Sequence, residues 1–127
     1  MTLRTWSIER GDWHVLRMCG DMDLLSSPEL RRRLHEAVAE GRRDVVIDLS
    51  DVVICDSTGV GVLIAARRLL RSCGGRLRLV LPGGCVAGVA GPSHVERVLS
   101  ALGVRRLFDV YGDLDSALDD AGEPLSA

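Results

Sequence analysis

A short β-branched run, DVVIDL at residues 44–49, constrains the fold more than any other part of this chain. Its residues are mostly apolar, which is typical of a central strand with both faces covered. A helical pattern lies on each side of it, one ending near Glu40 and one running from Ser57 to Cys73. Strands joined through helices are expected to be parallel, with right-handed crossovers. The run therefore predicts an α/β sheet.

Capping signals mark where the helices begin and end. SSPE at 26–29 combines a serine cap, an early proline and a glutamate at the third position after the cap. Gly74 and Gly75 stop the second helix. SHVE at 93–96 repeats the capping-box pattern before a third helix, and Asp113 is expected to cap a fourth.

The remaining strands are predicted from short apolar runs bounded by turns. The first two are separated by a polar turn at 10–12 and form a hairpin. With the helices they give the order ββαβαβαβα, a single α/β domain with a mixed, mainly parallel sheet and helices packed mostly on one face. We expect this domain to be folded over about residues 2–121, with a frayed tail at 122–127. The expected strands are 3–9, 13–19, 44–49, 76–81 and 107–110.

The composition fits one globular domain and argues against nucleic-acid binding. With 127 residues, 46% of them hydrophobic, the chain can bury one sizeable core. All sixteen basic residues are arginines, and eighteen carboxylates leave a net charge of −2. The run Arg31-Arg32-Arg33 could be interpreted as a phosphate-binding patch, but a solvated helix face is the favoured interpretation. We expect no nucleic-acid partner.

Cysteine usage and hydropathy predict a soluble, cytoplasmic protein. Cys19, Cys55, Cys73 and Cys85 are widely spaced and form no CxxC pair, so we expect reduced cysteines that are mostly buried in the core. The N-terminal stretch MTLRTWSIERGDW lacks the long apolar segment of a secretory signal. No apolar run is long enough to span a bilayer, so no membrane insertion is expected.

A serine hydrolase is the first enzyme to consider. Ser57 precedes a helix as a catalytic nucleophile would, but the GxSxG pattern is absent around it. The histidines are His14, His35 and His94, and of these His94, just inside a capping box, could approach Ser57 only through a chance tertiary arrangement. We expect His94 to be an imidazole on a helix surface, and we do not expect an enzyme.

Metal and nucleotide sites are also disfavoured. Five aspartates lie near predicted strand ends and could hold magnesium weakly, although solvated turn residues are the favoured interpretation. The glycine-rich loop at 82–92 lacks both the Gly-Lys-Ser/Thr ending of a P-loop and the GxGxxG pattern, so a connection with an apolar tip is favoured over nucleotide binding. No metal or cofactor is therefore expected. The aspartates are Asp21, Asp23, Asp48, Asp51 and Asp56.

The most informative stretch is CDSTGVG. Asp56, Ser57 and Thr58 all favour a helix start, whereas Gly59 and Gly61 are poor helix formers in the first turns. The two glycines suggest either that something approaches the backbone closely or that the site needs small side chains. A phosphate on Ser57 would be favoured by free amides and the helix dipole. We therefore expect this serine both to cap the helix and to tolerate phosphorylation.

Three stretches carry a family resemblance: VVIDLSDVVICDSTGVGVLIAARRLLRSCGGRLRLV, GDMDLLSSPELRRRL upstream of it and VERVLSALGVRRLFDVYGDLDSAL downstream. Over about Val15 to Leu118 the chain resembles the STAS domain, the module of sulphate transporters and anti-sigma factor antagonists. The most specific piece is a strand followed by Asp-Ser-Thr/Ser-Gly-x-Gly and a helix. The resemblance implies a single STAS domain over residues 1–127.

The resemblance also implies a phosphoswitch. In antagonist members, an anti-sigma factor that is a serine kinase phosphorylates the serine after the motif aspartate, which corresponds to Ser57. The unphosphorylated antagonist binds the anti-sigma factor and so releases the sigma factor; phosphorylation ends the binding and a phosphatase restores it. ATP and magnesium would belong to the partner kinase. The implied partner-binding residues are Asp23, Asp56, Ser57, Thr58, Gly59 and Gly61.

Three features depart from the family pattern. Cys55 replaces a bulkier apolar residue, and Thr58 stands where a second serine is common; both changes leave Ser57 intact. The loop at 82–92 is longer than in typical members, and it is expected to flank the phosphorylation site because both follow strand carboxyl ends. Different partners could therefore recognise this edge.

Two other functions stay open on the sequence. One is a constitutively binding STAS subunit, of a lipid-transport ATPase complex or of a stress-signalling scaffold. The other is a small-molecule or nucleotide sensor, which rests on the long loop alone. If the protein is an anti-sigma factor antagonist, we expect a bacterial, cytoplasmic protein that is a monomer or a weak homodimer. Arg67, Arg68 and Arg71 are either a further partner contact or a solvated face.

Overall fold

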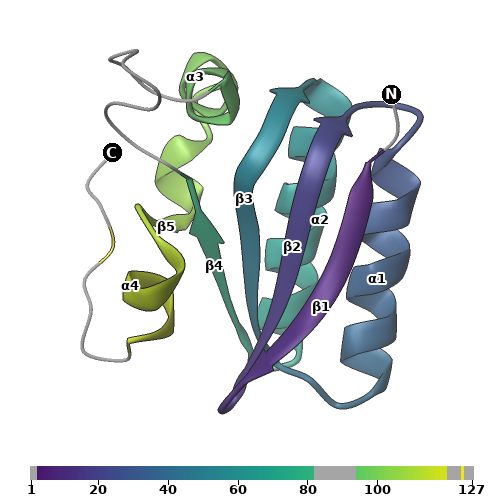
Figure 1. Ribbon diagram of the computed structural model, residues 1–127, viewed down its shortest axis with the longest axis vertical. Coiled ribbons are helices and arrows are strands. Elements are labelled where there is room, and N and C mark those ends of the chain that lie inside the picture. The colour runs from purple at the N-terminus through teal and green to yellow at the C-terminus, as the bar shows by residue number, and fades with distance from the viewer. Residues whose placement is uncertain (1–2, 82–93, 120–123, 125–127) are drawn as a thin grey trace.

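The computed structural model describes residues 3–81, 94–119 and 124. A five-stranded sheet, in the spatial order β1-β2-β3-β4-β5, forms its centre (Figure 1). β1 and β2 pair antiparallel as a hairpin, and the other three pairings are parallel. This confirms the predicted α/β fold and its mixed, mainly parallel sheet. The strands are β1 (Arg4–Arg10), β2 (Trp13–Met22), β3 (Asp44–Cys55), β4 (Arg76–Val80) and β5 (Asp109–Tyr111).

The longer helices cover one face of the sheet. α1 and α2 lie side by side behind β1, β2 and β3, and α3 lies at the end of the molecule where β3 ends (Figure 1). The short α4 packs on the other face with a small apolar cluster around Trp13 and Tyr111. The helices are α1 (Ser27–Ala39), α2 (Ser57–Ser72), α3 (His94–Ala101) and α4 (Leu114–Leu118).

The run DVVIDL is the centre of the core, as its composition predicts. Val45 and Ile47 point into the larger cluster beneath the helices, and Val46 points into the smaller cluster on the opposite face. All three are fully buried. Alternate side chains of one strand therefore hold both layers, because successive residues of a strand face opposite sides of the sheet. Burying each such side chain contributes roughly 1.5–3 kcal/mol.

β2 and β3 are longer than expected, which corrects two predicted boundaries. β2 continues to Met22 and β3 to Cys55, and these two residues are register partners. The pairing shifts at two irregularities, one of them between Gly20 and Asp21, where Gly20 has a φ of +113° that favours glycine. The extension is missed because polar residues interrupt the apolar run after Leu49. It carries both strands to a common edge.

Two local predictions are wrong. Ser26 stands at the N-cap of α1 but makes no capping bond with its side chain; its hydroxyl instead donates to the carbonyl of Asp21 at 2.5 Å. The last strand begins two residues late because Arg105–Leu107 forms a 3₁₀ turn. Asp113 caps α4 as predicted, accepting from the amide of Ser116 at 2.7 Å.

Some predictions fall on residues outside the described part of the chain. They include the loop at 82–92, the capping serine at 93 and most of the tail at 122–127. Within the described residues, no helix combines the length and apolar character needed to cross a membrane. Of the cysteines, Cys55 is buried and free, and Cys19 and Cys73 are half-buried and free.

Candidate functional site

The turn between β3 and α2 presents Ser57 to solvent. Asp56 is the N-cap of α2, and its Oδ1 accepts a hydrogen bond from the amide of Gly59 at 3.0 Å. Ser57 is the first helical residue and is exposed. The prediction that Ser57 itself caps the helix is therefore wrong, because the aspartate side chain already takes that role. Its hydroxyl makes no hydrogen bond with residues 3–81 or 94–119.

The turn between β2 and α1 lies against this site. Asp23 Oδ1 accepts from the amides of Leu25 and Ser26, each at 3.0 Å, and these N–H groups, chiefly that of Ser26, hold the pKa of Asp23 below its usual range. The second oxygen of Asp56, Oδ2, accepts from the amide of Leu24 at 3.2 Å. The structure thus brings Asp23 and Asp56 together, because parallel β2 and β3 end at the same edge.

The two glycines of the motif differ in their surroundings. A Cβ on Gly59 would lie 2.8 Å from the carbonyl oxygen of Met22 and 3.2 Å from Sγ of Cys55. Only glycine allows α2 to begin so close to the end of β2. A Cβ on Gly61 would meet no atom of the described residues within 4 Å, and Gly61 is exposed. Close packing therefore explains Gly59, whereas the described part of the chain gives no structural reason for Gly61. Thr58 is half-buried.

Three exposed apolar side chains belong to the segments that meet at Asp56, and the sequence analysis did not single them out. Leu24 is 66% exposed, Leu25 88% and Ile54 48%. Leu24 and Leu25 belong to the turn that Asp56 holds, and Ile54 lies two residues before it on β3. The signal in the sequence is the pair of leucines between Asp23 and the serines. We call this set the rim surface: Asp23, Leu24, Leu25, Ile54, Asp56 and Ser57.

His94 joins the site from α3. Its Nδ1 accepts a hydrogen bond from the amide of Cys55 at 3.0 Å, so this nitrogen carries no proton in the arrangement seen. His94 is exposed on α3, as expected for an imidazole on a helix surface, and it gains this partner because β3 extends far enough for its last amide to reach α3. Burial, with the Asp56 charge, raises the pKa of the Cys55 thiol to about 12, so the cysteine stays protonated and unreactive.

The five aspartates near the predicted strand ends do not form one cluster. Asp48 is buried within β3 beside Arg17, with the Nε of Arg17 3.4 Å from its Oδ2, and Asp51 lies on the same arginine at 3.8 Å. Asp48 and Asp51 lie within β3, which continues to Cys55, so they are separated from Asp23, which follows the end of β2. Among the described residues, no group of three or more histidine, cysteine, aspartate or glutamate side chains could hold a metal ion.

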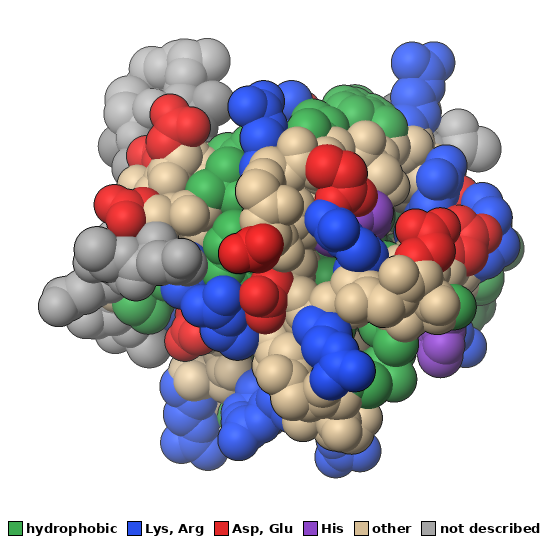
Figure 2. Space-filling model, turned by 90° about the horizontal axis from the view of Figure 1, so that it is seen from below, with side chains coloured by type: hydrophobic (Ala, Val, Ile, Leu, Met, Phe, Trp, Pro, Cys, Tyr) green, Lys and Arg blue, Asp and Glu red, His purple; other side chains and the backbone are tan. Residues whose placement is uncertain are grey.

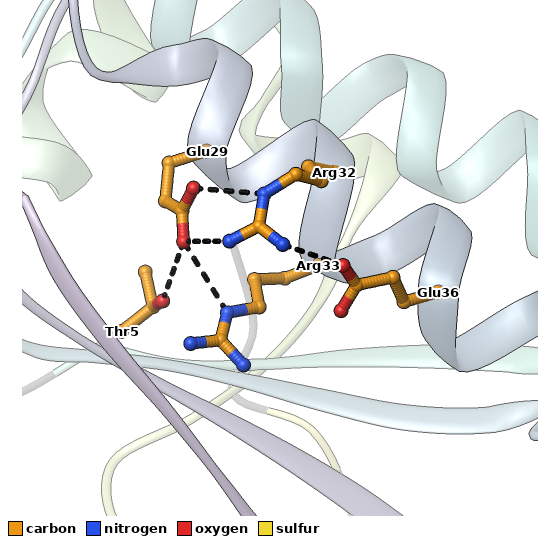
Figure 3. Close-up of polar contacts among 5 residues, drawn as sticks. All are labelled: Thr5, Glu29, Arg32, Arg33 and Glu36. Carbon is orange, nitrogen blue, oxygen red and sulfur yellow. Dashed lines mark hydrogen bonds and ion pairs between the residues drawn. The ribbon is translucent and has the colours of Figure 1, made fainter.

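Two of the three arginines in the run at 31–33, Arg32 and Arg33, are engaged by glutamates of their own helix, whereas Arg31 is exposed. Arg32 donates to Glu29 at 2.7 Å and contacts Glu36 at 2.5 Å, and Arg33 also reaches Glu29 (Figure 3). The hydrogen bond from Arg32 holds the pKa of Glu29 below its usual range. The side chain of Thr5 on β1 lies against the same carboxylate. This face is an ion-paired surface rather than a set of cations ready for phosphate.

His14 and His35 lie away from Ser57. His14 is buried at the start of β2, where its Nδ1 is 2.5 Å from Glu9 Oε1, and His35 is exposed on α1. Arg67 is half-buried and donates through Nε to the carbonyl of Leu107 at 2.7 Å, so it is not simply a solvated side chain; Arg68 and Arg71 are exposed. No histidine of the described chain is hydrogen-bonded to Ser57.

The site therefore combines an exposed hydroxyl on a helix N-terminus, two carboxylates engaged by amides, and an apolar border. The STAS domain model matches residues 7–117, which is most of the chain. The chain belongs to the STAS domain family. The resemblance of the strand, Asp-Ser-Thr-Gly-x-Gly and helix is confirmed, and these elements occupy β3, the turn and α2.

Similar proteins within the STAS family carry antagonist names. The chain is 38% identical over 64 residues to the anti-sigma-B factor antagonist of Bacillus subtilis, and this match covers 50% of the chain and 58% of that protein. It is 25% identical over 107 residues to the anti-sigma F factor antagonist of Paenibacillus polymyxa, covering 84% of each. The chain spans 65% of the anti-sigma-B factor antagonists of Staphylococcus epidermidis, so it matches less than two thirds of several curated relatives.

Solved structures give the same fold. An anti-sigma factor antagonist from Mycobacterium paratuberculosis superposes with a TM-score of 0.77 at 26% identity, covering 91% of both chains. The Bacillus cell fate determinant SpoIIAA in its phosphorylated form superposes with a TM-score of 0.65 at 19% identity, covering 91% of this chain and 97% of that one. The latter likeness shows the fold alone.

Proposed function

We propose that this protein is a cytoplasmic anti-sigma factor antagonist and that Ser57 is its phosphorylation site. The unphosphorylated form binds an anti-sigma factor with serine kinase activity and releases the sigma factor. Phosphorylation of Ser57 ends this binding, and a phosphatase restores it. The protein is a binding module without catalysis of its own, and ATP and magnesium enter with the kinase.

One observation carries the proposal: Ser57 is exposed, while the neighbouring Asp56 does the capping. A serine needed as a cap could not be modified without weakening its helix. Here Asp56 accepts from the amide of Gly59, and the Ser57 hydroxyl has no partner among the described residues. The family name shared by the relatives supports the same reading. The exposed Ser57 hydroxyl beside Asp56 also favours the switch over the alternative of a constitutively binding subunit.

The rim surface supplies a physical reason for release. A phosphoserine adds a charge of about −1.5 to −2 at neutral pH. The phosphate would stand beside Asp56, whose two carboxylate oxygens already accept hydrogen bonds from backbone amides, and close to Asp23. The phosphate and Asp56 would also compete for the free amides of the first helical turn. A partner that accepts the uncharged surface would then meet a strongly anionic one.

The apolar part of the rim surface provides affinity. Leu24 and Leu25 are among the most exposed large hydrophobic side chains in the described chain. Burying such side chains in an interface is a common source of binding energy, whereas nearby charges set specificity. Thr58, Gly59 and Gly61 complete the proposed contact, with Gly61 leaving room for a close approach by the partner.

The test is phosphorylation by candidate serine-kinase anti-sigma factors with ATP and magnesium, followed by intact-mass and peptide analysis. The wild type should gain one phosphate on Ser57, and Ser57→Ala should gain none while keeping its fold. Thr58→Val is the matched control and should be phosphorylated like the wild type. Phosphate on Thr58 instead, or no phosphate from any cognate kinase, would overturn the proposed site.

A binding measurement separates the switch from constitutive binding. Ser57→Ala should bind the unmodified anti-sigma factor as the wild type does. Ser57→Asp should bind at least about tenfold more weakly, because like charges at an interface cost affinity. Equal affinities for the two variants would contradict electrostatic release and favour a constitutively binding STAS subunit.

A further inference from the structure

A pocket at the opposite end of α2 from Ser57 has no role in the proposed switch. It has a volume of about 230 Å³ and lies where α2, β4 and the segment before β5 meet. Figure 2 looks at the molecule from the end where α2 finishes, and arginine side chains stand out along its lower edge. The lining residues are Arg67, Arg71, Gly75, Arg76, Leu77, Leu107, Phe108 and Asp109.

Two arginines of α2 give the pocket its charge. Arg67 is held in place because its Nε donates to the carbonyl of Leu107, and its remaining guanidinium nitrogens have no hydrogen bond with described residues. Arg71 follows one helical turn later, and its guanidinium makes no hydrogen bond or ion pair within residues 3–81 and 94–119. Side chains four residues apart on a helix lie on the same face. Two guanidinium groups therefore face one pocket without a carboxylate partner of their own.

The other two charged residues of the pocket add little attraction for an anion, because one is an arginine already paired with a carboxylate and the other is an aspartate. Arg76 forms a two-point contact with Asp44, at 3.1 and 3.0 Å, and lies over the ring of Trp13. Asp109 contributes one exposed carboxylate. The end of α2 carries partial negative charge from the helix dipole, which also disfavours an anion. Arg67 and Arg71 must therefore supply the attraction for any anionic ligand.

Part of the pocket lining is apolar. Leu77, Leu107 and Phe108 are its large hydrophobic residues. The volume of about 230 Å³ lies below the roughly 300–1,000 Å³ typical of ligand pockets. The space thus suits a small ligand with one strongly anionic group and a short apolar body. A phosphate monoester offers nearly two charges and three acceptor oxygens to guanidinium donors, whereas a carboxylate offers one charge and two oxygens.

We propose that this pocket binds a small soluble organic phosphate. Its phosphate lies between Arg67 and Arg71, and its organic part packs on the wall formed by Leu77, Leu107 and Phe108. Along a helix that rises about 1.5 Å per residue, Arg71 stands roughly 20 Å from Ser57. The site is therefore separate from the rim surface, and it extends the role of the protein beyond the proposed switch.

Phenyl phosphate and inorganic phosphate are the probes. Their binding is monitored through the amide chemical shifts of the whole chain in an NMR titration. Both should give saturable shifts around Gly75 and Leu107, with phenyl phosphate binding at least about threefold more tightly because its ring covers apolar wall. Benzoate should bind at least about fivefold more weakly than phenyl phosphate because it has a single charge.

Three variants test the residues. Arg71→Gln should weaken phenyl phosphate binding by at least about fivefold. Arg68→Gln is the matched control, because Arg68 is an exposed arginine of the same helix that does not line the pocket; it should change binding less than about twofold. Asp109→Asn should tighten binding because it removes the opposing carboxylate.

Several outcomes would overturn the proposal. They are the absence of saturable shifts, equal losses in Arg68→Gln and Arg71→Gln, and benzoate binding as tightly as phenyl phosphate. Each variant is at an exposed position, and its amide spectrum reports whether it is folded. Ser57→Ala should bind phenyl phosphate like the wild type, so the pocket and the phosphoswitch can fail independently.

Discussion

The two ends of α2 present opposite chemistry on one helix. At its N-terminal end the chain exposes two leucines and a serine, next to two aspartates whose carboxylates accept hydrogen bonds from backbone amides. At its last turns it exposes arginines around an apolar pocket. A helix of 16 residues spans only about 24 Å, so these surfaces are close but do not overlap. One element can therefore carry two independent sites when each end is held by a different strand.

Both ends depend on a glycine that lets backbones approach, and the approach is tighter at the arginine end. A Cβ on Gly75 would lie 2.1 Å from the carbonyl oxygen of Arg43, which already accepts from the amide of Arg76. Neither backbone can move without breaking this hydrogen bond at the start of β4. We expect Gly75→Ala to destabilise the protein by about 3 kcal/mol or more, beyond the usual cost of overpacking. Urea unfolding measures it, and a loss under about 1 kcal/mol would contradict the close approach.

The corresponding glycine of the rim end should cost less. Gly59→Ala places a Cβ 2.8 Å from the carbonyl oxygen of Met22, and part of the cost is offset by the better helix propensity of alanine. A net loss of about 1–2 kcal/mol is expected. Gly61→Ala is the control, and with open space around it the change should stabilise by up to about 1 kcal/mol. Equal unfolding midpoints for the two variants would remove the distinction between them.

Capping strength should distinguish the rim end from the other aspartate-capped helix. Asp56→Ala removes acceptors from two amides, of Gly59 and Leu24, whereas Asp113→Ala removes one, of Ser116. We expect a loss of about 1–2 kcal/mol for Asp56→Ala and about half of this for Asp113→Ala. Thermal and urea unfolding provide the comparison. A larger loss for Asp113→Ala would show that the second acceptor role of Asp56 has no energetic weight.

The smallest effect concerns two carboxylates with lowered pKa values but different causes. Hydrogen bonds from Ser26 lower the pKa of Asp23, whereas a hydrogen bond and charge from Arg76 lower the pKa of Asp44. Both contribute stability that is present above the unfolded pKa of about 3.9 and is lost as the pH falls through the folded values. Added salt screens the ion pair, so we expect the pKa of Asp44 to rise in 1 M NaCl and that of Asp23 to stay. An NMR pH titration of the two side-chain carboxyls at low and high salt measures this, and equal responses would contradict the assignment of causes.

The sequence predicts elements better than it predicts contacts. DVVIDL and the helical stripes are repeated local signals, and they lead to the correct order of strands and helices. The extension of β3 to Cys55 is different, because polar residues there are stabilised by pairing with β2 rather than by their own propensity. Propensity is a weak guide wherever a tertiary partner supplies the hydrogen bonds.

The candidate site shows the same limit. Ser57 and Asp56 are recognisable from a contiguous motif, and Asp23 from the family pattern. The assignment of the cap to Asp56 depends on which of three neighbouring oxygens reaches the amide of Gly59, which is a matter of backbone geometry. The bond between His94 and Cys55 joins residues 39 positions apart and leaves no local trace in the sequence.

The carboxylate of Asp56 makes two distant turns one thermodynamic unit. One oxygen holds the first turn of α2, and the other holds the amide of Leu24, 32 positions away in the sequence. A ligand that stabilises the Leu24 turn therefore also stabilises the helix start at Ser57. Suppose that a chemical change at Ser57 alters the affinity of that ligand by some factor. Linkage then requires that the bound ligand alter the equilibrium constant of the chemical change at Ser57 by the same factor. Reciprocity of this kind needs no movement of the sheet, only the two hydrogen bonds that the Asp56 carboxylate accepts.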